Sequence, residues 1–123
     1  MADKLKISSE SSGFLNILSS RLVLKRNVVC RIAISISLSK REPVPEIITN
    51  NSEGYEFNKT TILGPDEVLF KTAVAFVQGK PCDKDYFNIL VRNHLERGLE
   101  MMYAGFMEVN SPTQYLAGLS ESH

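Results

Sequence analysis

Apolar residues recur at helical spacing in the first third of the chain. The repeating positions are Phe14, Leu15, Leu18 and Leu22. Their intervals of three and four residues predict a helix over about 9–21, for which Ser8 is a suitable N-terminal cap. Before it, residues 4–7 alternate polar with apolar side chains, which predicts a short strand or extended arm that shows Lys4 and Lys6 on one side.

The segment after residues 23–26, which would form a turn, permits two interpretations. The two-residue period of a strand is carried by Ile32, Ile34, Ile36 and Leu38. One face of a helix would instead gather Val29, Ile32, Ala33 and Ile36. Because Asn27 is also a good cap, we predict a second helix through about Ser39 with this face buried.

The composition changes after Pro43 and Pro45, which end the second helix. Two β-prone runs at 47–49 and 55–57 flank a stretch that is rich in Asn and contains Gly54. This pattern predicts a short β-hairpin or an irregular excursion in the middle of the chain.

Two further helices are predicted in the second half. Residues 64–67 are typical of a helix start, and Gly79 with Pro81 would end that helix. Its expected buried face consists of Leu69, Ala73, Phe76 and Val77. Asp83 can cap a last long helix that reaches about Ala104. The apolar stripe of this helix comprises Phe87, Leu90, Val91, Leu95, Leu99 and Met102.

Together these elements predict a mainly α fold. We expect a compact single-domain helical bundle with a short N-terminal extended arm and a short β-hairpin or irregular excursion in the middle. A chain of 123 residues has the ordinary length of one domain. The domain would occupy residues 1–107, and residues 108–123 would form a polar, flexible tail.

The distribution of charge adds a functional hypothesis to this fold. Residues 1–41 contain eight basic and two acidic residues, whereas residues 42–123 contain six basic and twelve acidic ones. The neutral total therefore conceals a strongly dipolar chain. Such asymmetry is typical of nucleic-acid binding at the basic end, although charges that merely solvate a helical surface would give the same count.

The candidate DNA contacts lie where an arm and a helix–helix turn would project side chains outward. They are Lys4, Lys6, Arg21, Lys25, Arg26 and Asn27. Near Asn27, the free N–H groups at the start of the second helix would add an anion site. Lysine and arginine contacts of this kind neutralise phosphates and carry little sequence information. Residues 1–107 would thus be a single helical DNA-binding domain.

The sequence contains no recognisable catalytic machinery. His94 and His123 have no nearby Cys or second His to complete a metal set, and the glycines lack the strand–loop–helix context of a phosphate loop. Cys30 and Cys82 lie far apart, as expected of reduced thiols in the cytoplasm. No apolar run is long enough to cross a bilayer. We therefore expect a cytoplasmic protein that is not an enzyme and has no catalytic residue, metal or cofactor.

Two segments resemble the DndE family of small DNA sulfur-modification proteins. One is Asn-Val-Val-Cys-Arg-Ile-Ala at 27–33, which follows Leu-Val-Leu-Lys-Arg at 22–26. The other is Arg-Asn-His-Leu-Glu-Arg-Gly-Leu at 92–99, closed by Tyr-Ala-Gly at 103–105. The resemblance spans most of the chain, and the order of helix pair, proline-rich exit, variable middle and late helix also fits.

This resemblance implies a component of a phosphorothioation system, in which sulfur replaces a non-bridging phosphate oxygen of DNA. In this family the sulfur chemistry belongs to other proteins, while similar proteins bind nicked duplex DNA and assemble as homotetramers. The implied partners are double-stranded DNA, intact or nicked, other DNA sulfur-modification proteins and further copies of the chain. The motif positions with an expected structural role are Cys30, Arg31, His94, Arg97 and Gly98. Arg31 and Arg97 would tie helices together, and Gly98 would allow close helix approach.

Self-association is also expected from the second helix, which is apolar on more than one side, with a monomer in which this helix is wholly central as the alternative. Two other classes of protein remain open. In a ribbon-helix-helix regulator, residues 4–7 would pair with the same strand of a partner and read the major groove. In an assembly adaptor, the acidic half would dock a larger protein and the basic end would have no direct role in DNA binding.

Overall fold

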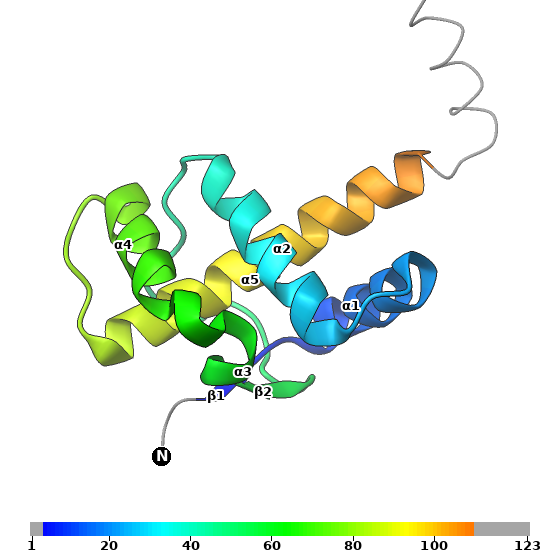
Figure 1. Ribbon diagram of the computed structural model, residues 1–123, viewed down its shortest axis with the longest axis horizontal. Coiled ribbons are helices and arrows are strands. Elements are labelled where there is room, and N and C mark those ends of the chain that lie inside the picture. Colours follow the sequence, from blue (N-terminus) through cyan, green and yellow to red (C-terminus); the bar gives the residue numbers. More distant parts are fainter. Residues whose placement is uncertain (1–3, 110–123) are drawn as a thin grey trace, which may run out of the picture.

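A computed structural model describes residues 4–109 of the chain (Figure 1). The predicted mainly α fold is confirmed, and from residue 110 onward the expected polar tail lies outside the described residues. The elements in chain order are β1 (Lys4–Lys6), α1 (Ser9–Leu22), α2 (Arg26–Ser39), β2 (Glu56–Asn58), α3 (Lys59–Leu63), a 3-10 turn (Gly64–Asp66), α4 (Glu67–Gln78) and α5 (Lys84–Val109). Within this part of the chain, no helix combines the length and the apolar character that crossing a membrane requires.

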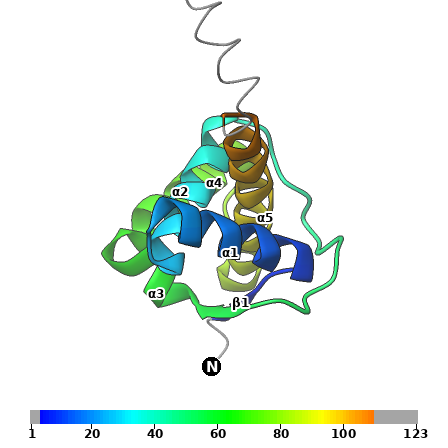
Figure 2. The ribbon, with the colours of Figure 1, turned by 90° about the vertical axis from the view of Figure 1, so that its right-hand side faces the viewer.

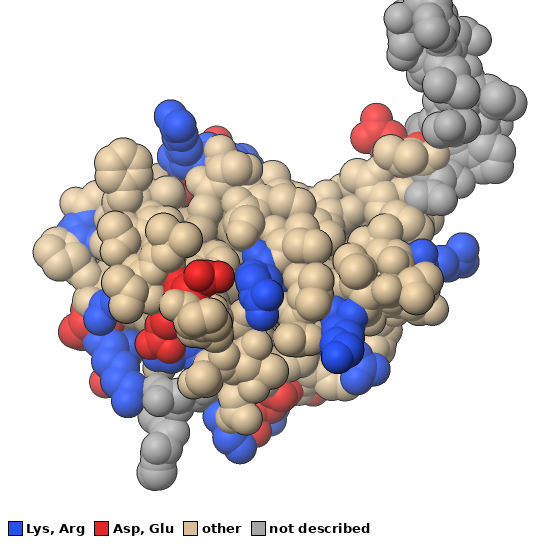
Figure 3. Space-filling model, viewed as in Figure 1, with Lys and Arg blue, Asp and Glu red and all other residues tan. Residues whose placement is uncertain are grey.

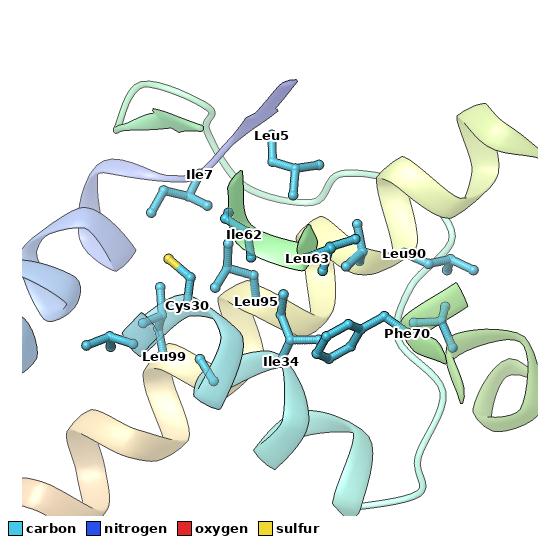
Figure 4. Packing of buried hydrophobic residues seen from close by; sticks show 14 of the residues in the cluster. Leu5, Ile7, Cys30, Ile34, Ile62, Leu63, Phe70, Leu90, Leu95 and Leu99 are labelled. Carbon is cyan, nitrogen blue, oxygen red and sulfur yellow. The ribbon is translucent and has the colours of Figure 1, made fainter. Parts of the chain in front are cut away.

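Helix α5 is the element around which the others are arranged. Figure 1 shows it running behind α2, with α4 at one end and α1 towards the other. In the perpendicular view of Figure 2, α1 lies across the front of the molecule beside α2 and α5. The core between these elements is made of buried apolar side chains from β1 and from helices α1 to α5, several of which point toward one another in Figure 4. Each such side chain stabilises the fold by about 1.5–3 kcal/mol relative to an exposed one.

Local capping signals were predicted correctly at several helix ends. The Ser8 side chain accepts a hydrogen bond from the N–H of Ser11 at the start of α1. Gly79 ends α4 in the left-handed conformation, with φ of 83°. Asp83 Oδ1 accepts the N–H of Tyr86 at 2.8 Å, so it caps α5, which extends beyond the predicted end to Val109.

The predicted β-hairpin does not form, and the irregular excursion is the correct alternative. β2 overlaps the 55–57 run but pairs antiparallel with β1, so that Leu5 lies opposite Phe57. The 47–49 run is irregular, and side chains of α5 support this part of the chain. The Asn93 amide, for example, donates to the carbonyl oxygens of Pro45 and Ile47.

Arg92 of α5 holds the N-terminal strand and this excursion together. Its guanidinium is almost fully buried and donates to the carbonyl oxygen of Lys6, to Asn50 Oδ1 and to the carbonyl oxygen of Asn51. A buried cation of this kind is tolerated because its N–H groups are hydrogen-bonded. The arm is therefore a fixed part of the fold.

The start of α2 differs from the prediction. The helix begins at Arg26, with Lys25 in an extended conformation at the N-cap and no side-chain cap. Asn27 therefore lies in the first turn and does not cap. The physical reason is that the N–H groups of Val28 and Val29 both bond to the carbonyl oxygen of Lys25, which places the helix start two residues earlier.

The predicted buried faces of α2 and α4 were partly wrong. In α2 the buried residues are Val29, Cys30, Ala33, Ile34 and Ser37, whereas Ile32 is exposed and Ile36 is half-buried. In α4, Phe70 and Val74 are buried, whereas Leu69 and Phe76 are 67% and 80% exposed. Both helices are apolar on two sides, so the pattern alone does not select a face, and tertiary packing makes the choice.

Candidate nucleic-acid interface

The hairpin formed by α1 and α2 has one acidic residue, Glu10 in the first turn of α1, and the sequence contains no Asp or Glu from Ser11 to Arg41. Its turn carries three exposed cations, Arg21, Lys25 and Arg26, which we call the turn cations. Among the described residues, none forms an ion pair with them. In the space-filling view of Figure 3, the side chains around the α1–α2 turn, at the right, are basic or uncharged. The turn is therefore a locally uncompensated positive surface.

The backbone of this turn is held in one geometry. Val23 adopts the left-handed conformation, with φ of 54° and ψ of 49°, and its N–H donates to the carbonyl oxygen of Ser19. The N–H of Leu24 donates to that same oxygen at 3.1 Å, and the Ser19 hydroxyl donates to the carbonyl oxygen of Leu24. These bonds fix the positions from which the turn cations project.

Arg26 is oriented by two partners on neighbouring elements. Its Nη2 donates to Asn16 Oδ1 at 3.1 Å, and its guanidinium carbon lies 4.6 Å from the centre of the Tyr55 ring. The Tyr55 hydroxyl donates to the same Asn16 oxygen at 2.9 Å. The guanidinium is thus pre-organised while its other N–H groups stay available, which lowers the entropy lost on binding a phosphate.

The start of α2 adds main-chain donors next to these side chains. Since Val28 and Val29 bond to Lys25, the N–H groups of Arg26 and Asn27 remain without a hydrogen bond among the described residues. They lie at the positive end of the helix dipole, where an anion is favoured. This is the position of the anion site expected near Asn27.

Lys4 and Lys6 project from β1 on the side opposite the buried Leu5. Lys4 Nζ lies 3.6 Å from a carboxylate oxygen of Glu56, which also faces Lys6 across the two strands. The arm is therefore partly neutralised, unlike the α1–α2 turn. Tyr55 connects the two regions, because its ring contacts Arg26 and its carbonyl oxygen accepts the N–H of Ile7 just after β1.

The motif arginines lie between helices. Arg31 Nε donates to the carbonyl oxygen of Ile62 at 2.8 Å and so joins α2 to α3. Arg97 Nε donates to Ser37 Oγ, and its Nη2 donates to the carbonyl oxygens of Ser37 and Glu42, each at 2.8 Å. Arg97 thereby satisfies main-chain oxygens at the C-terminal end of α2. Neither arginine belongs to the positive surface of the turn.

Cys30 of α2 and His94 of α5 are both fully buried. Burial raises the pKa of the Cys30 thiol to about 12. Burial, together with the nearby charge of Arg97, lowers the pKa of His94 to about 4. His94 Nδ1 lies 2.8 Å from Ser37 Oγ, and Nε2 has no hydrogen-bond partner within residues 4–109. The thiol and the imidazole are thus neutral, enclosed groups at neutral pH.

A metal centre is not formed by the described residues, among which no three His, Cys, Asp or Glu side chains come together in a suitable group. The sequence does not predict two residues of the interface, Asn16 and Tyr55. They come from helix α1 and from the segment before β2, and only the tertiary fold brings them to Arg26. A lone Asn on an exposed helical face carries no signal of this role.

Comparison with known proteins adds one finding. A family model described as DNA sulphur modification protein DndE matches residues 4–110. No curated protein matches the chain at a significant level. The matched segment contains both the basic hairpin and the late helix motif at 92–99.

Proposed function

The chain belongs to the DndE family of DNA sulphur modification proteins, and we propose that it is the non-catalytic component that holds DNA by phosphate contacts. A role in DNA sulfur modification follows from the family. The observation that supports DNA binding is the α1–α2 hairpin, which has no acidic residue from Ser11 to its end and exposes the three turn cations. The proposal also places the protein in the cytoplasm.

The binding would be electrostatic and insensitive to sequence. The turn cations neutralise phosphates and release condensed counterions, and the N–H groups of Arg26 and Asn27 donate to a phosphate oxygen. Phosphate contacts position a protein on the duplex without distinguishing the bases. A nicked duplex is favoured over an intact one because the broken strand bends at lower cost.

The sulfur chemistry would be carried out by other proteins of the system. A nucleophile or a general base must reach its substrate and must ionise near the working pH. Cys30 and His94 are fully buried, and their pKa values are moved away from neutrality in the directions that favour the uncharged forms. These two side chains are therefore poor candidates for catalysis.

The proposal includes assembly of several copies, with a tetramer favoured. The outer face of α2 presents Ile32 and Ile36 beside Arg31 in a shallow groove. Figure 3 shows wide uncharged areas over α2 and α4. Covering such a face with the same face of another copy forms a closed symmetric contact and collects the basic hairpins into one larger surface.

The two other classes have less support. A ribbon-helix-helix regulator needs its N-terminal strand for pairing between copies, whereas β1 pairs with β2 of the same chain. An assembly adaptor needs no uncompensated basic surface, yet the α1–α2 turn provides one. DNA binding itself separates the adaptor from the proposed function.

Fluorescence anisotropy of the full chain tests the proposal. Two labelled duplexes of unrelated sequence and a nicked form of one of them are titrated at several salt concentrations. Similar affinities for the two duplexes are expected, with log K falling linearly with log salt by about 0.9 for each phosphate contact. A large difference between the duplexes would favour the regulator, and absence of binding at low salt would favour the adaptor.

A further inference from the structure

The tip of the α1–α2 turn exposes an unusual apolar residue. Val23 is 86% exposed although its side chain is a hydrocarbon, and Leu22 and Leu24 beside it are 40% and 37% exposed. Val23 is also left-handed, with φ of 54°. A β-branched residue is strained in that conformation, which Gly or Asn adopts more easily. Neither burial nor backbone preference explains why valine stands here.

The surroundings of this tip indicate what it contacts. The turn cations flank it on both sides in the sequence, and no acidic residue occurs within ten positions of Val23. An apolar tip framed by unpaired cations complements a polyanion that has an apolar interior. Duplex DNA has this character, because charged phosphates enclose stacked bases. A second protein chain would have to place carboxylates opposite the turn cations.

The tip is also rigid enough to be pushed into a partner. The N–H groups of Val23 and Leu24 both donate to the carbonyl oxygen of Ser19, so the backbone of the turn is fixed in the conformation that exposes Val23. Proteins that kink DNA insert apolar side chains of this size between base steps. In an intact duplex, opening a step costs stacking energy, whereas at a nick one strand is already interrupted.

We propose that Val23 and Leu24 form an apolar wedge that enters the base stack at a nick in duplex DNA. The turn cations hold the phosphates on either side of the break during this insertion. The inference rests on the proposed function, since it requires DNA binding, and it gives that function a structural basis for preferring nicked DNA. The wedge adds to the preference that the easier bending of a broken strand gives, and the cations supply the affinity common to all duplexes.

The test uses the full chain and a duplex that carries 2-aminopurine beside a central nick, with an uncut duplex of the same sequence as reference. Unstacking raises 2-aminopurine fluorescence, so binding of the unmodified protein to the nicked duplex should brighten the probe. Val23→Asn removes the apolar group while keeping a residue that tolerates the left-handed backbone. It should lower the preference for the nicked duplex by about tenfold and abolish the brightening.

Affinity for the uncut duplex and the salt dependence should be unchanged in Val23→Asn, because no charge is removed. Val68→Asn is the matched control, since Val68 is 77% exposed on α4, and it should behave like the unmodified protein. Retention of the preference and of the brightening in Val23→Asn would overturn the wedge. A changed molar mass in light scattering would also overturn it, because the turn would then be a contact between copies. If the unmodified protein binds neither duplex, the proposed function itself fails.

Discussion

Gly98 of α5 lies directly against the main chain of Ala33 in α2. A Cβ placed on Gly98 would be 1.8 Å from the carbonyl oxygen of Ala33 and 2.4 Å from its carbonyl carbon. These neighbours are backbone atoms inside a helix, so they have no flexible end that could move aside. The missing side chain therefore sets the separation of the two helices that share the most extensive contact in the fold.

Gly98→Ala should consequently destabilise the protein by about 3 kcal/mol, at the upper end of ordinary overpacking. Gly105→Ala is the control on the same helix, because a Cβ at Gly105 meets nothing within 4 Å. That change should stabilise the helix by roughly 0.5–1 kcal/mol. Urea unfolding followed by circular dichroism measures both, and equal stability of the two variants would contradict the close approach.

Replacing Lys25 and Arg26 together by Ala should weaken DNA binding equally for unrelated sequences. It should also make the log–log salt slope shallower by about two, since two phosphate contacts are lost. Lys71→Ala with Lys80→Ala removes the same charge from α4 and its C-terminal end, away from the α1–α2 turn. This control should leave the slope nearly unchanged in anisotropy titrations. Equal effects of both double variants would mean that only net charge matters.

Stability should fall as the pH is lowered from about 6.5 to about 4, through the ionisation of His94. The pKa of His94 in the folded protein is lowered to about 4, so the unfolded chain binds a proton in this window and the folded chain does not. The loss is at most about 1.4 kcal/mol per pH unit. His94→Gln should flatten this dependence in urea titrations between pH 7 and 5. An unchanged slope in His94→Gln would assign the effect to another group.

Ile32→Asp should reduce the molar mass measured by light scattering to that of one chain, because Ile32 lies on the outer face of α2 at 36% exposure. The fold should survive, since the core does not contain this side chain. Ile34→Asp is the contrast, because Ile34 is fully buried and a carboxylate there should unfold the protein. A single-chain mass for the unmodified protein, unchanged on dilution, would exclude the assembly.

The sequence predicts those parts of the fold that depend on neighbouring residues. Ser8, Gly79 and Asp83 act within one helical turn, so their roles could be read directly from the sequence. The buried face of α2 depends on Gly98, which lies far along the chain and admits only the side of α2 that carries Ala33. No local pattern contains that information.

In the candidate site, too, the sequence predicts what depends on neighbouring residues and does not predict contacts between distant ones. The turn cations were predicted because their exposure follows from a short connection between two helices. The partners that orient Arg26 were not, since Asn16 and Tyr55 come together only in the tertiary fold. The sequence does not decide between a hairpin and an irregular middle segment for a similar reason, because the carbonyl oxygens of Pro45 and Ile47 are satisfied by a side chain of α5 rather than by a neighbouring strand.

The hydrogen bond from Arg92 to the carbonyl oxygen of Lys6 also bears on the order of folding. These residues are 86 positions apart, and closing a loop of that length is entropically costly and slow. During synthesis, β1 can pair with β2 once residues 56–58 have emerged, but its bond to Arg92 forms only after α5 has left the ribosome. Helices α1 and α2 can form before then, because their contacts are local. The basic end of the chain is thus translated first, and its strand is joined to α5 only when that last helix has been made.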